Sequence, residues 1–194
     1  GGQVVGEFVG AQPEPRVREF LKDIAPSQSD ESQITADSLI ADRAWEQAEK
    51  MYRQILDEDT GNAAAQLGLA RTLVGQGRGV EARDLLETLI NVPEVMNSAE
   101  KLLAAANFVA LVEEQADDTH LELIPAEAQY RQAARLLARG KLPAAMDGLL
   151  DVLRYNKRYR EGKAKEAILG IFELLGDDDP LTNQYRRELA SVLF

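Results

Sequence analysis

The sequence predicts an all-α protein, a solenoid of about four antiparallel helix pairs. Ala48 is followed by large apolar residues at the fourth, seventh and eighth positions after it, and the same arrangement recurs 34 residues later from Ala82. This spacing places the residues on one face of a helix. A glycine precedes Ala82 by five residues, and Gly140 precedes Ala145 by the same distance. The alanine pattern therefore occurs three times, and a glycine break precedes it in two of them.

The composition excludes several classes of function. The 194 residues include 22 Lys and Arg against 33 Asp and Glu, a net charge of −11. Since an acidic surface repels phosphate backbones, we do not expect nucleic acid as a general partner. The chain has no cysteine, which excludes disulfides, thiolate catalysis and cysteine metal sites. His120 is the one histidine and cannot form a metal site alone, so we expect neither a metal nor a cofactor.

The hydropathy pattern indicates no membrane segment. A membrane span needs about 18 apolar residues, and the longest apolar runs are much shorter. No basic region followed by an apolar run marks a signal peptide at the beginning of the sequence. We expect a cytoplasmic location in a bacterium and no membrane partner.

Residues 1–25 have a different pattern from the rest. Residues 4–9 form a short β-like run between glycines, and Pro13 and Pro15 open an apolar helix that ends before Pro26. One strand and one helix cannot bury a core of their own. We interpret 1–25 as the end of a domain whose front lies upstream. Its spaced residues resemble the last strand and last helix of thioredoxin: Gly2, Val5, Phe8, Gly10 and Pro13.

Residues 26–33 are polar without apolar periodicity and are predicted to be a linker, and 34–194 to be the repeat domain. Between Ala82 and Ala145 the spacing is 63 residues, not twice 34, so the repeat loses its phase. We interpret the helices at 97–115 and 125–138 as a degenerate pair. The helices of the domain are expected at 34–42, 44–58, 62–75, 79–90, 97–115, 125–138, 142–155, 160–175 and 180–194.

The period, the helix break and the mid-helix alanine resemble tetratricopeptide repeats. The first helix of each pair in such repeats lines a concave face that holds ligands. Many of these proteins clamp a peptide carboxylate there with Lys and Asn. Leu67, Arg71, Tyr130 and Ala134 occupy the corresponding positions, so that clamp is absent in its usual form. Arg71, Asn107 and Tyr130 remain groove candidates, with ordinary surface residues as the alternative.

One segment of the sequence is basic, although the chain as a whole is acidic. Six cations fall within residues 154–165, interleaved with Tyr155 and Tyr159. One interpretation is structural: in a solvated turn after a helix, these cations interact favourably with the negative end of the helix dipole. The alternatives are a patch for an acidic protein partner and, by stacking, single-stranded nucleic acid. The patch residues are Arg154, Lys157, Arg158 and Arg160.

Two carboxylate-rich segments are candidate chemical sites. Residues 177–179 are three aspartates but lack the calcium-loop spacing, so a solvated turn with Asp179 as a helix N-cap is the preferred interpretation. His120 lies beside Asp117 and Asp118 without a nucleophile or a glycine-rich loop nearby. We expect no catalytic residue and no enzyme.

The last predicted helix is the most specific candidate for a partner-binding site. It has an apolar stripe and an apolar end, with Arg186 and Arg187 on its polar face. Such a helix can dock into an apolar groove of another protein. The alternative is that it caps the solenoid core. The partner-binding candidates are Tyr185, Leu189, Val192, Leu193 and Phe194.

The closing sequence resembles the end of the YbbN/CnoX family, bacterial proteins with a thioredoxin-like domain followed by tetratricopeptide repeats. The resemblance rests on Leu174, Leu175, Gly176, Asp179, Pro180, Leu181, Tyr185, Arg186, Arg187, Leu189, Ala190, Leu193 and Phe194. It implies an ATP-independent holdase that protects unfolded or partly folded proteins and passes them to the chaperonin GroEL. It also implies that the last helix docks to the chaperonin. The family's cysteines lie outside this sequence, so its redox activity stays undecided.

The predicted function is therefore a protein-binding co-chaperone module without catalysis. The alternative is a repeat scaffold that binds one dedicated protein partner.

Overall fold

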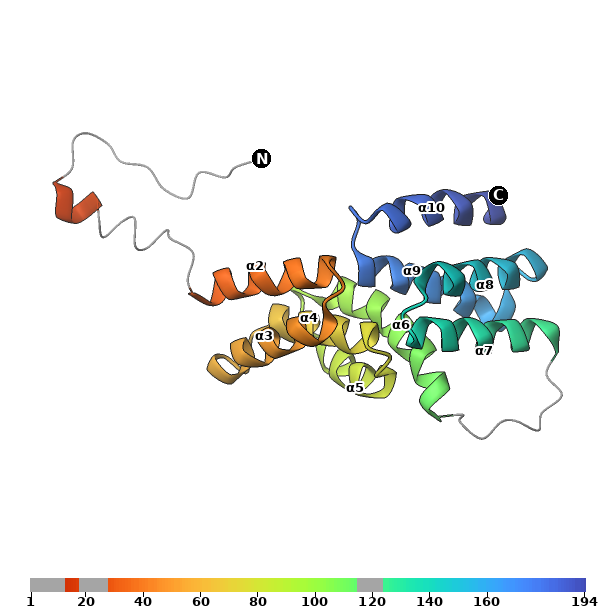
Figure 1. Cartoon of the computed structure of the whole chain (residues 1–194), viewed down its shortest axis with the longest axis horizontal. Helices are drawn as coiled ribbons and strands as arrows, with labels where there is room; N and C mark the ends of the chain where they lie inside the picture. The colour runs from red at the N-terminus through yellow and green to blue at the C-terminus, as the bar shows by residue number, and fades with distance from the viewer. Residues whose placement is uncertain (1–12, 18–27, 115–123) are drawn as a thin grey trace.

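A computed structural model describes residues 13–17, 28–114 and 124–194, and in these residues the regular structure is entirely helical. The helices stack in antiparallel succession (Figure 1), which confirms the all-α solenoid. No helix in this part of the chain is long and apolar enough to cross a bilayer. The helices are α2 (Gln28–Ala41), α3 (Trp45–Glu58), α4 (Ala63–Gly75), α5 (Gly79–Leu89), α6 (Met96–Glu114), α7 (Pro125–Ala138), α8 (Leu142–Tyr155), α9 (Lys163–Leu175) and α10 (Pro180–Leu193), with a 3₁₀ turn at Tyr159–Gly162 before α9.

The N-terminal predictions are only partly within the described residues. The strand expected at 4–9 lies outside them, as does most of the helix expected after it. The helical turn at Pro13 is present: the amides of Arg16 and Val17 donate to its carbonyl at 3.0 and 3.2 Å. The thioredoxin-like assignment of 1–25 stays a prediction.

Helix α2 begins earlier than the sequence predicts. The sequence predicts a linker at residues 26–33, but residues 28–33 are helical. A helix satisfies its own backbone hydrogen bonds, so a polar first turn can extend away from the packed core. The side chains that fix α2 come later, at Ala36 and Ile40, which are buried, while Ile34 is exposed. Absence of apolar periodicity was therefore the wrong criterion for a linker here.

The 34-residue pattern has the predicted packing role. Ala48, Ala82 and Ala145 are completely buried, and each lies in the second helix of a pair. The large residues at the fourth and seventh positions after them are also buried and form the core between neighbouring helices: Tyr52, Ile55, Leu86, Leu89, Leu149 and Val152. At the eighth position, Leu56 and Ile90 are only partly buried.

Helix α6 departs from the expected pairing. It packs most extensively against α5 and α9, whereas α7 packs against α8. The two helices predicted as a degenerate pair are thus not principal partners. Alanines on α6 allow close backbone approach: a Cβ added at Gly79 would lie 2.3 Å from the Ala110 nitrogen, and one at Gly170 2.6 Å from the Ala105 nitrogen. Figure 1 shows α6 between the N-terminal and C-terminal helices.

Two ion pairs connect the early helices to the late ones. Arg43, between α2 and α3, lies 3.1 Å from Asp179 at the start of α10. Arg71 of α4 lies 3.1 Å from Glu173 of α9. These contacts hold the first two helix pairs against the last one.

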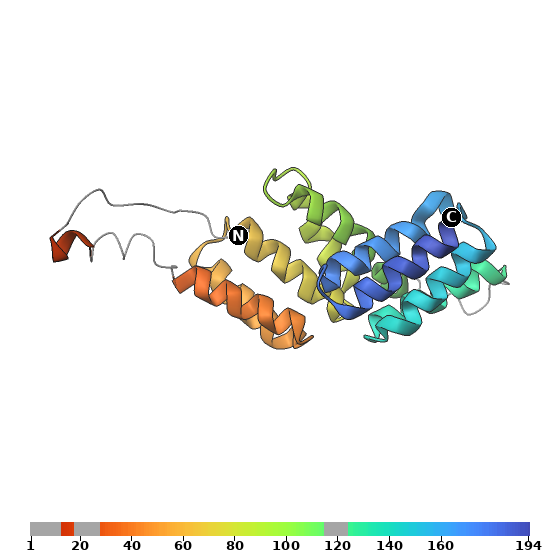
Figure 2. The same cartoon turned by 90° about the horizontal axis from the view of Figure 1, so that it is seen from above.

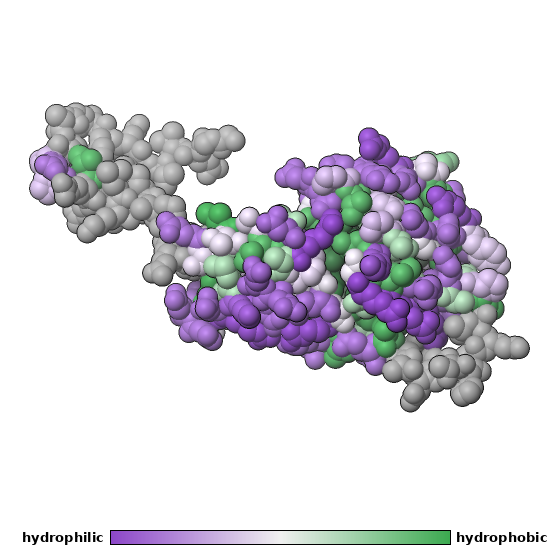
Figure 3. Space-filling model, in the orientation of Figure 1, coloured by the Kyte–Doolittle hydropathy of each residue, from purple (hydrophilic) through white to green (hydrophobic). Residues whose placement is uncertain are grey.

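Helix α10 lies along α8 and α9 (Figure 2), with more of its contact made to α8. This arrangement leaves the side of α10 that faces α9 partly open. On the face shown in Figure 3, apolar side chains appear among polar ones over the C-terminal helices, whereas polar side chains dominate over α3 and α5.

Candidate protein-interaction site

The candidate site lies between α9 and α10, and local sequence fixes where both helices begin and end. Gly176 terminates α9 with a φ of 89°, a left-handed conformation that suits glycine. Asp179 caps α10 by accepting a hydrogen bond from the Leu181 amide at 2.8 Å, and Pro180 occupies the first turn. This confirms the N-cap interpretation of Asp179.

Tyr185 anchors α10 on α8. Its ring is buried, and its hydroxyl donates to Asp147 Oδ1 at 2.7 Å and lies 3.1 Å from the Pro143 carbonyl oxygen. Burial and the neighbouring Asp147 carboxylate raise the pKa of the Tyr185 hydroxyl. Leu189 is also buried. Two of the five partner-binding candidates thus hold the helix in place.

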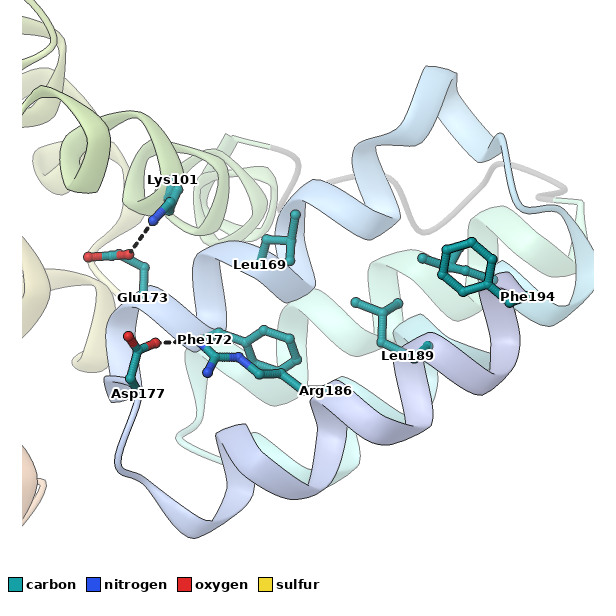
Figure 4. Close-up of a pocket in the computed structure, with 10 residues that line it drawn as sticks. Lys101, Leu169, Phe172, Glu173, Asp177, Arg186, Leu189 and Phe194 are labelled. Carbon is teal, nitrogen blue, oxygen red and sulfur yellow. Dashed lines mark hydrogen bonds and ion pairs between the residues drawn. The ribbon is translucent and has the colours of Figure 1, made fainter.

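A groove of about 340 Å³ lies between α9 and α10 (Figure 4). Its walls are apolar along most of their length, and a charged cluster lies at one end. It is lined by Lys101, Leu169, Phe172, Glu173, Asp177, Arg186, Leu189, Ala190, Leu193 and Phe194.

The charges at the charged end of the groove are paired with one another. Glu173 contacts Arg71 at 3.1 Å and Lys101 at 3.4 Å. Arg186 pairs with Asp177, and this hydrogen bond lowers the pKa of the Asp177 carboxyl. The Arg186 guanidinium also lies 5.7 Å from the centre of the Phe172 ring and covers part of it. This end therefore presents no uncompensated charge to a ligand.

The other end of the groove is apolar and open. Leu169 is 38% exposed, and Phe194 is fully exposed at 104%. Val192 and Leu193 are half-buried between them and the core. In Figure 4 Phe194 stands at the far end of α10, away from the ion pairs. An exposed aromatic ring beside an apolar groove is a typical contact point for another protein.

The groove candidates from the sequence separate into two places. Arg71 reaches Glu173 at the C-terminal groove. Asn107 and Tyr130 instead line a second, smaller pocket of about 200 Å³ between α6, α7 and α9, together with Arg160. Tyr130 is buried, and Asn107 is exposed.

Aromatic stacking and one carboxylate organise this second pocket. The Tyr130 ring centre lies 4.8 Å from that of Phe108 and 5.3 Å from that of Tyr159, and the Arg160 guanidinium lies 5.3 Å from Tyr130. Burial would raise the pKa of Glu127, but hydrogen bonds from Tyr159 and Arg131, with the charge of Arg160, lower it. The pocket is stabilised from within, because its charges are already compensated.

The turn before α9 has an unusual backbone. Arg160 and Glu161 have positive φ angles of 46° and 57°, in the left-handed region. The buried Tyr159 holds the turn by donating its hydroxyl to Glu127, and burial raises the Tyr159 pKa to about 12. Arg160 adds a 2.9 Å ion pair to the same carboxylate. These contacts offset the cost of the left-handed residues.

The basic patch is largely neutralised. Arg154 lies 2.6 Å from Asp151, and Arg160 contacts Glu127. Lys157 donates to the Leu193 carbonyl at 2.9 Å, which satisfies a backbone acceptor at the end of α10. Arg158 is exposed. The patch therefore supports the last two helices, a role that the charge pattern alone left open.

Sequence reasoning missed the α9 side of the groove. Leu169 and Phe172 belong to an amphipathic pattern that fits ordinary core packing, and no local signal marks which of them stays exposed. Glu173 is identified only by its long-range partners on α4 and α6. His120 lies outside the described residues, so the expectation that it has no catalytic role stays a prediction.

Comparison with known proteins bears on both halves of the chain. Two profiles, each described as tetratricopeptide repeat, match residues 39–92 and 104–194. An uncharacterized protein of Haemophilus influenzae is 33% identical over 69 residues. That match covers 36% of this chain and 32% of the relative, so the chain spans about a third of that protein. The matched ranges contain α3 to α5 and α7 to α10. The chain is therefore a protein that contains tetratricopeptide repeats in both its N-terminal and its C-terminal half.

Proposed function

We propose that this chain is a protein-binding co-chaperone module that acts without catalysis. It holds unfolded or partly folded proteins and docks to the chaperonin GroEL through the Phe194 end of α10, in the bacterial cytoplasm. Tetratricopeptide repeats are protein-interaction modules, which supports the general class. The chaperonin and the clients rest on the resemblance of the two ends of the sequence to the YbbN/CnoX family.

The observation that carries the proposal is the apolar groove that ends in Phe194. A fully exposed Phe is costly to keep in water, and its burial against a partner is favourable by about 1.5–3 kcal/mol. Tyr185 fixes the helix that presents it, so docking requires little ordering of the protein. Excess negative charge favours solubility of complexes with apolar clients.

The holdase activity is tested by aggregation of a chemically denatured client enzyme, followed by light scattering. The chain at equimolar or higher amounts should suppress aggregation without nucleotide. Unchanged scattering would show that the repeats alone are not the holdase.

The docking step is tested separately with purified GroEL. Deletion of residues 192–194 should abolish binding, because it removes Phe194 and the half-buried residues that support it. Unchanged affinity would refute docking through this end. A pull-down then addresses the alternative function: a single stoichiometric partner, without client breadth, would indicate a dedicated scaffold.

A further inference from the structure

Another groove lies between α6 and α7, and it is lined by residues that do not line the C-terminal groove. Its volume is about 310 Å³. The floor is apolar, from Leu111 and Val112 of α6 and from Ala134 and Ala138 of α7. The other lining residues in the described part of the chain are arginines: Arg131, Arg135 and Arg139.

The three arginines form a row. They are spaced by four residues along α7 and its C-cap, so they lie on one face, about 6 Å apart along the helix axis. Arg131 is held by Glu127 and is mostly buried. Arg135 and Arg139 are exposed, and within the described part of the chain their side chains make no ion pair or hydrogen bond.

The acidic residues at the end of α6 are engaged elsewhere. Glu113 accepts a hydrogen bond from the Val80 amide at 2.9 Å, and Glu114 pairs with Arg83 at 2.7 Å. Both contacts are to α5. Among the described residues, two guanidinium groups without a paired carboxylate therefore lie over an apolar floor, in a chain whose net charge is −11.

We propose that this groove binds an amphipathic helical segment of a partner protein, with carboxylates on every fourth residue and leucine-like side chains beside them. Carboxylates four residues apart on a helix have the same spacing as the arginines, and guanidinium groups bind them in bidentate fashion. The apolar side chains enter the floor between α6 and α7. Charge complementarity selects this partner over the apolar segments that suit the Phe194 end.

The test is a fluorescence anisotropy titration of the full chain with a labelled helical peptide of about 18 residues. The peptide carries Glu at every fourth position and Leu beside each Glu, and a matched peptide carries Gln in place of Glu. The Glu peptide should bind saturably and at least about tenfold more tightly than the Gln peptide, a difference of about 1.4 kcal/mol. Higher salt should weaken it, because the contacts are partly exposed.

The variant Arg135→Glu/Arg139→Glu should reduce affinity for the Glu peptide at least about tenfold. Its control is Arg158→Glu/Arg187→Glu, which makes the same charge change at two exposed arginines outside the groove and should bind within about twofold of the unmodified chain. Circular dichroism checks that both variants fold.

Equal losses in the two variants, or no binding of the Glu peptide, would overturn the proposal. Tighter binding of a single-stranded oligonucleotide at the same two arginines would also overturn it. The proposal is independent of the co-chaperone function, because client protection and chaperonin docking are read out with other probes.

Discussion

Tyr185 illustrates what a single side chain decides in this molecule. Its place on an apolar stripe with Leu189 is visible in the sequence, but the stripe fits an inward and an outward orientation equally well. The hydrogen bond to Asp147, 38 residues away, selects the inward one. Since a pair so distant leaves no local pattern, only the structure separates the residues that anchor α10 from Phe194, which stays exposed.

The variant Tyr185→Phe tests this anchor. It keeps the ring and removes the hydroxyl that bonds Asp147, so we expect the free energy of unfolding to fall by about 1 kcal/mol. Urea denaturation monitored by circular dichroism measures the change. Tyr155 is 77% exposed, and Tyr155→Phe is the control, with an expected change below about 0.5 kcal/mol. Equal effects of the two substitutions would argue against the anchoring role.

Glu49 couples stability to pH. Burial would raise its pKa, but hydrogen bonds from Gln76, Arg53 and Arg78 outweigh that effect and lower it from 4.5 to about 2. Because the folded-state pKa is depressed, this carboxylate stabilises the protein above pH 4.5. The contribution is lost as the pH falls toward 2.

The variant Glu49→Gln should therefore lose stability at neutral pH, by about 1–2 kcal/mol for the weakened charge-assisted hydrogen bonds. The difference in the free energy of unfolding between this variant and the unmodified chain should shrink as the pH is lowered below 4.5. Urea unfolding at neutral and acidic pH measures both. A difference that stays constant over the acidic range would contradict the assignment.

At the scale of the elements, helix ends were predicted better than helix partners. The glycine at 176 and the Asp179–Pro180 pair are local signals, and the structure places α9 and α10 accordingly. Pairing of α6 with α5 and α9 depends instead on close contacts between small residues, Gly79 with Ala110 and Gly170 with Ala105. An alanine-rich helix offers close approach on several faces, and the sequence does not say which face each neighbour uses.

The crossing of α6 and α9 should be sensitive to one methyl group. In Gly170→Ala the new Cβ would lie 2.6 Å from the Ala105 nitrogen, a backbone atom that cannot move alone. We expect a loss of about 1–3 kcal/mol from overpacking, measured as a lowered thermal midpoint. Gly61→Ala is the control, because its Cβ would meet only the Asp59 carboxylate at 3.4 Å. A Gly170→Ala protein as stable as the unmodified chain would show that the crossing relaxes.

At the scale of the whole molecule, the solenoid brings the chain's early and late helices together. Arg43 and Asp179 are 136 residues apart in sequence and 3.1 Å apart in space. The period predicted the stack and its buried alanines, but it carries no information on such contacts. The two grooves likewise come from the packing of α9 with α10 and of α6 with α7. The protein-binding class follows from the repeats, whereas the identity of each partner depends on these surfaces.

The proposed contact between Phe194 and a chaperonin can be tested with one point substitution. Phe194→Ser removes the exposed ring and leaves Tyr185, Leu189 and the helix intact, while Tyr155→Ser removes an exposed ring elsewhere. Binding of both variants to immobilised GroEL is measured by biolayer interferometry. We expect at least about tenfold weaker binding for Phe194→Ser and no more than about a twofold change for Tyr155→Ser. Wild-type affinity of the Phe194→Ser chain would contradict the proposed contact.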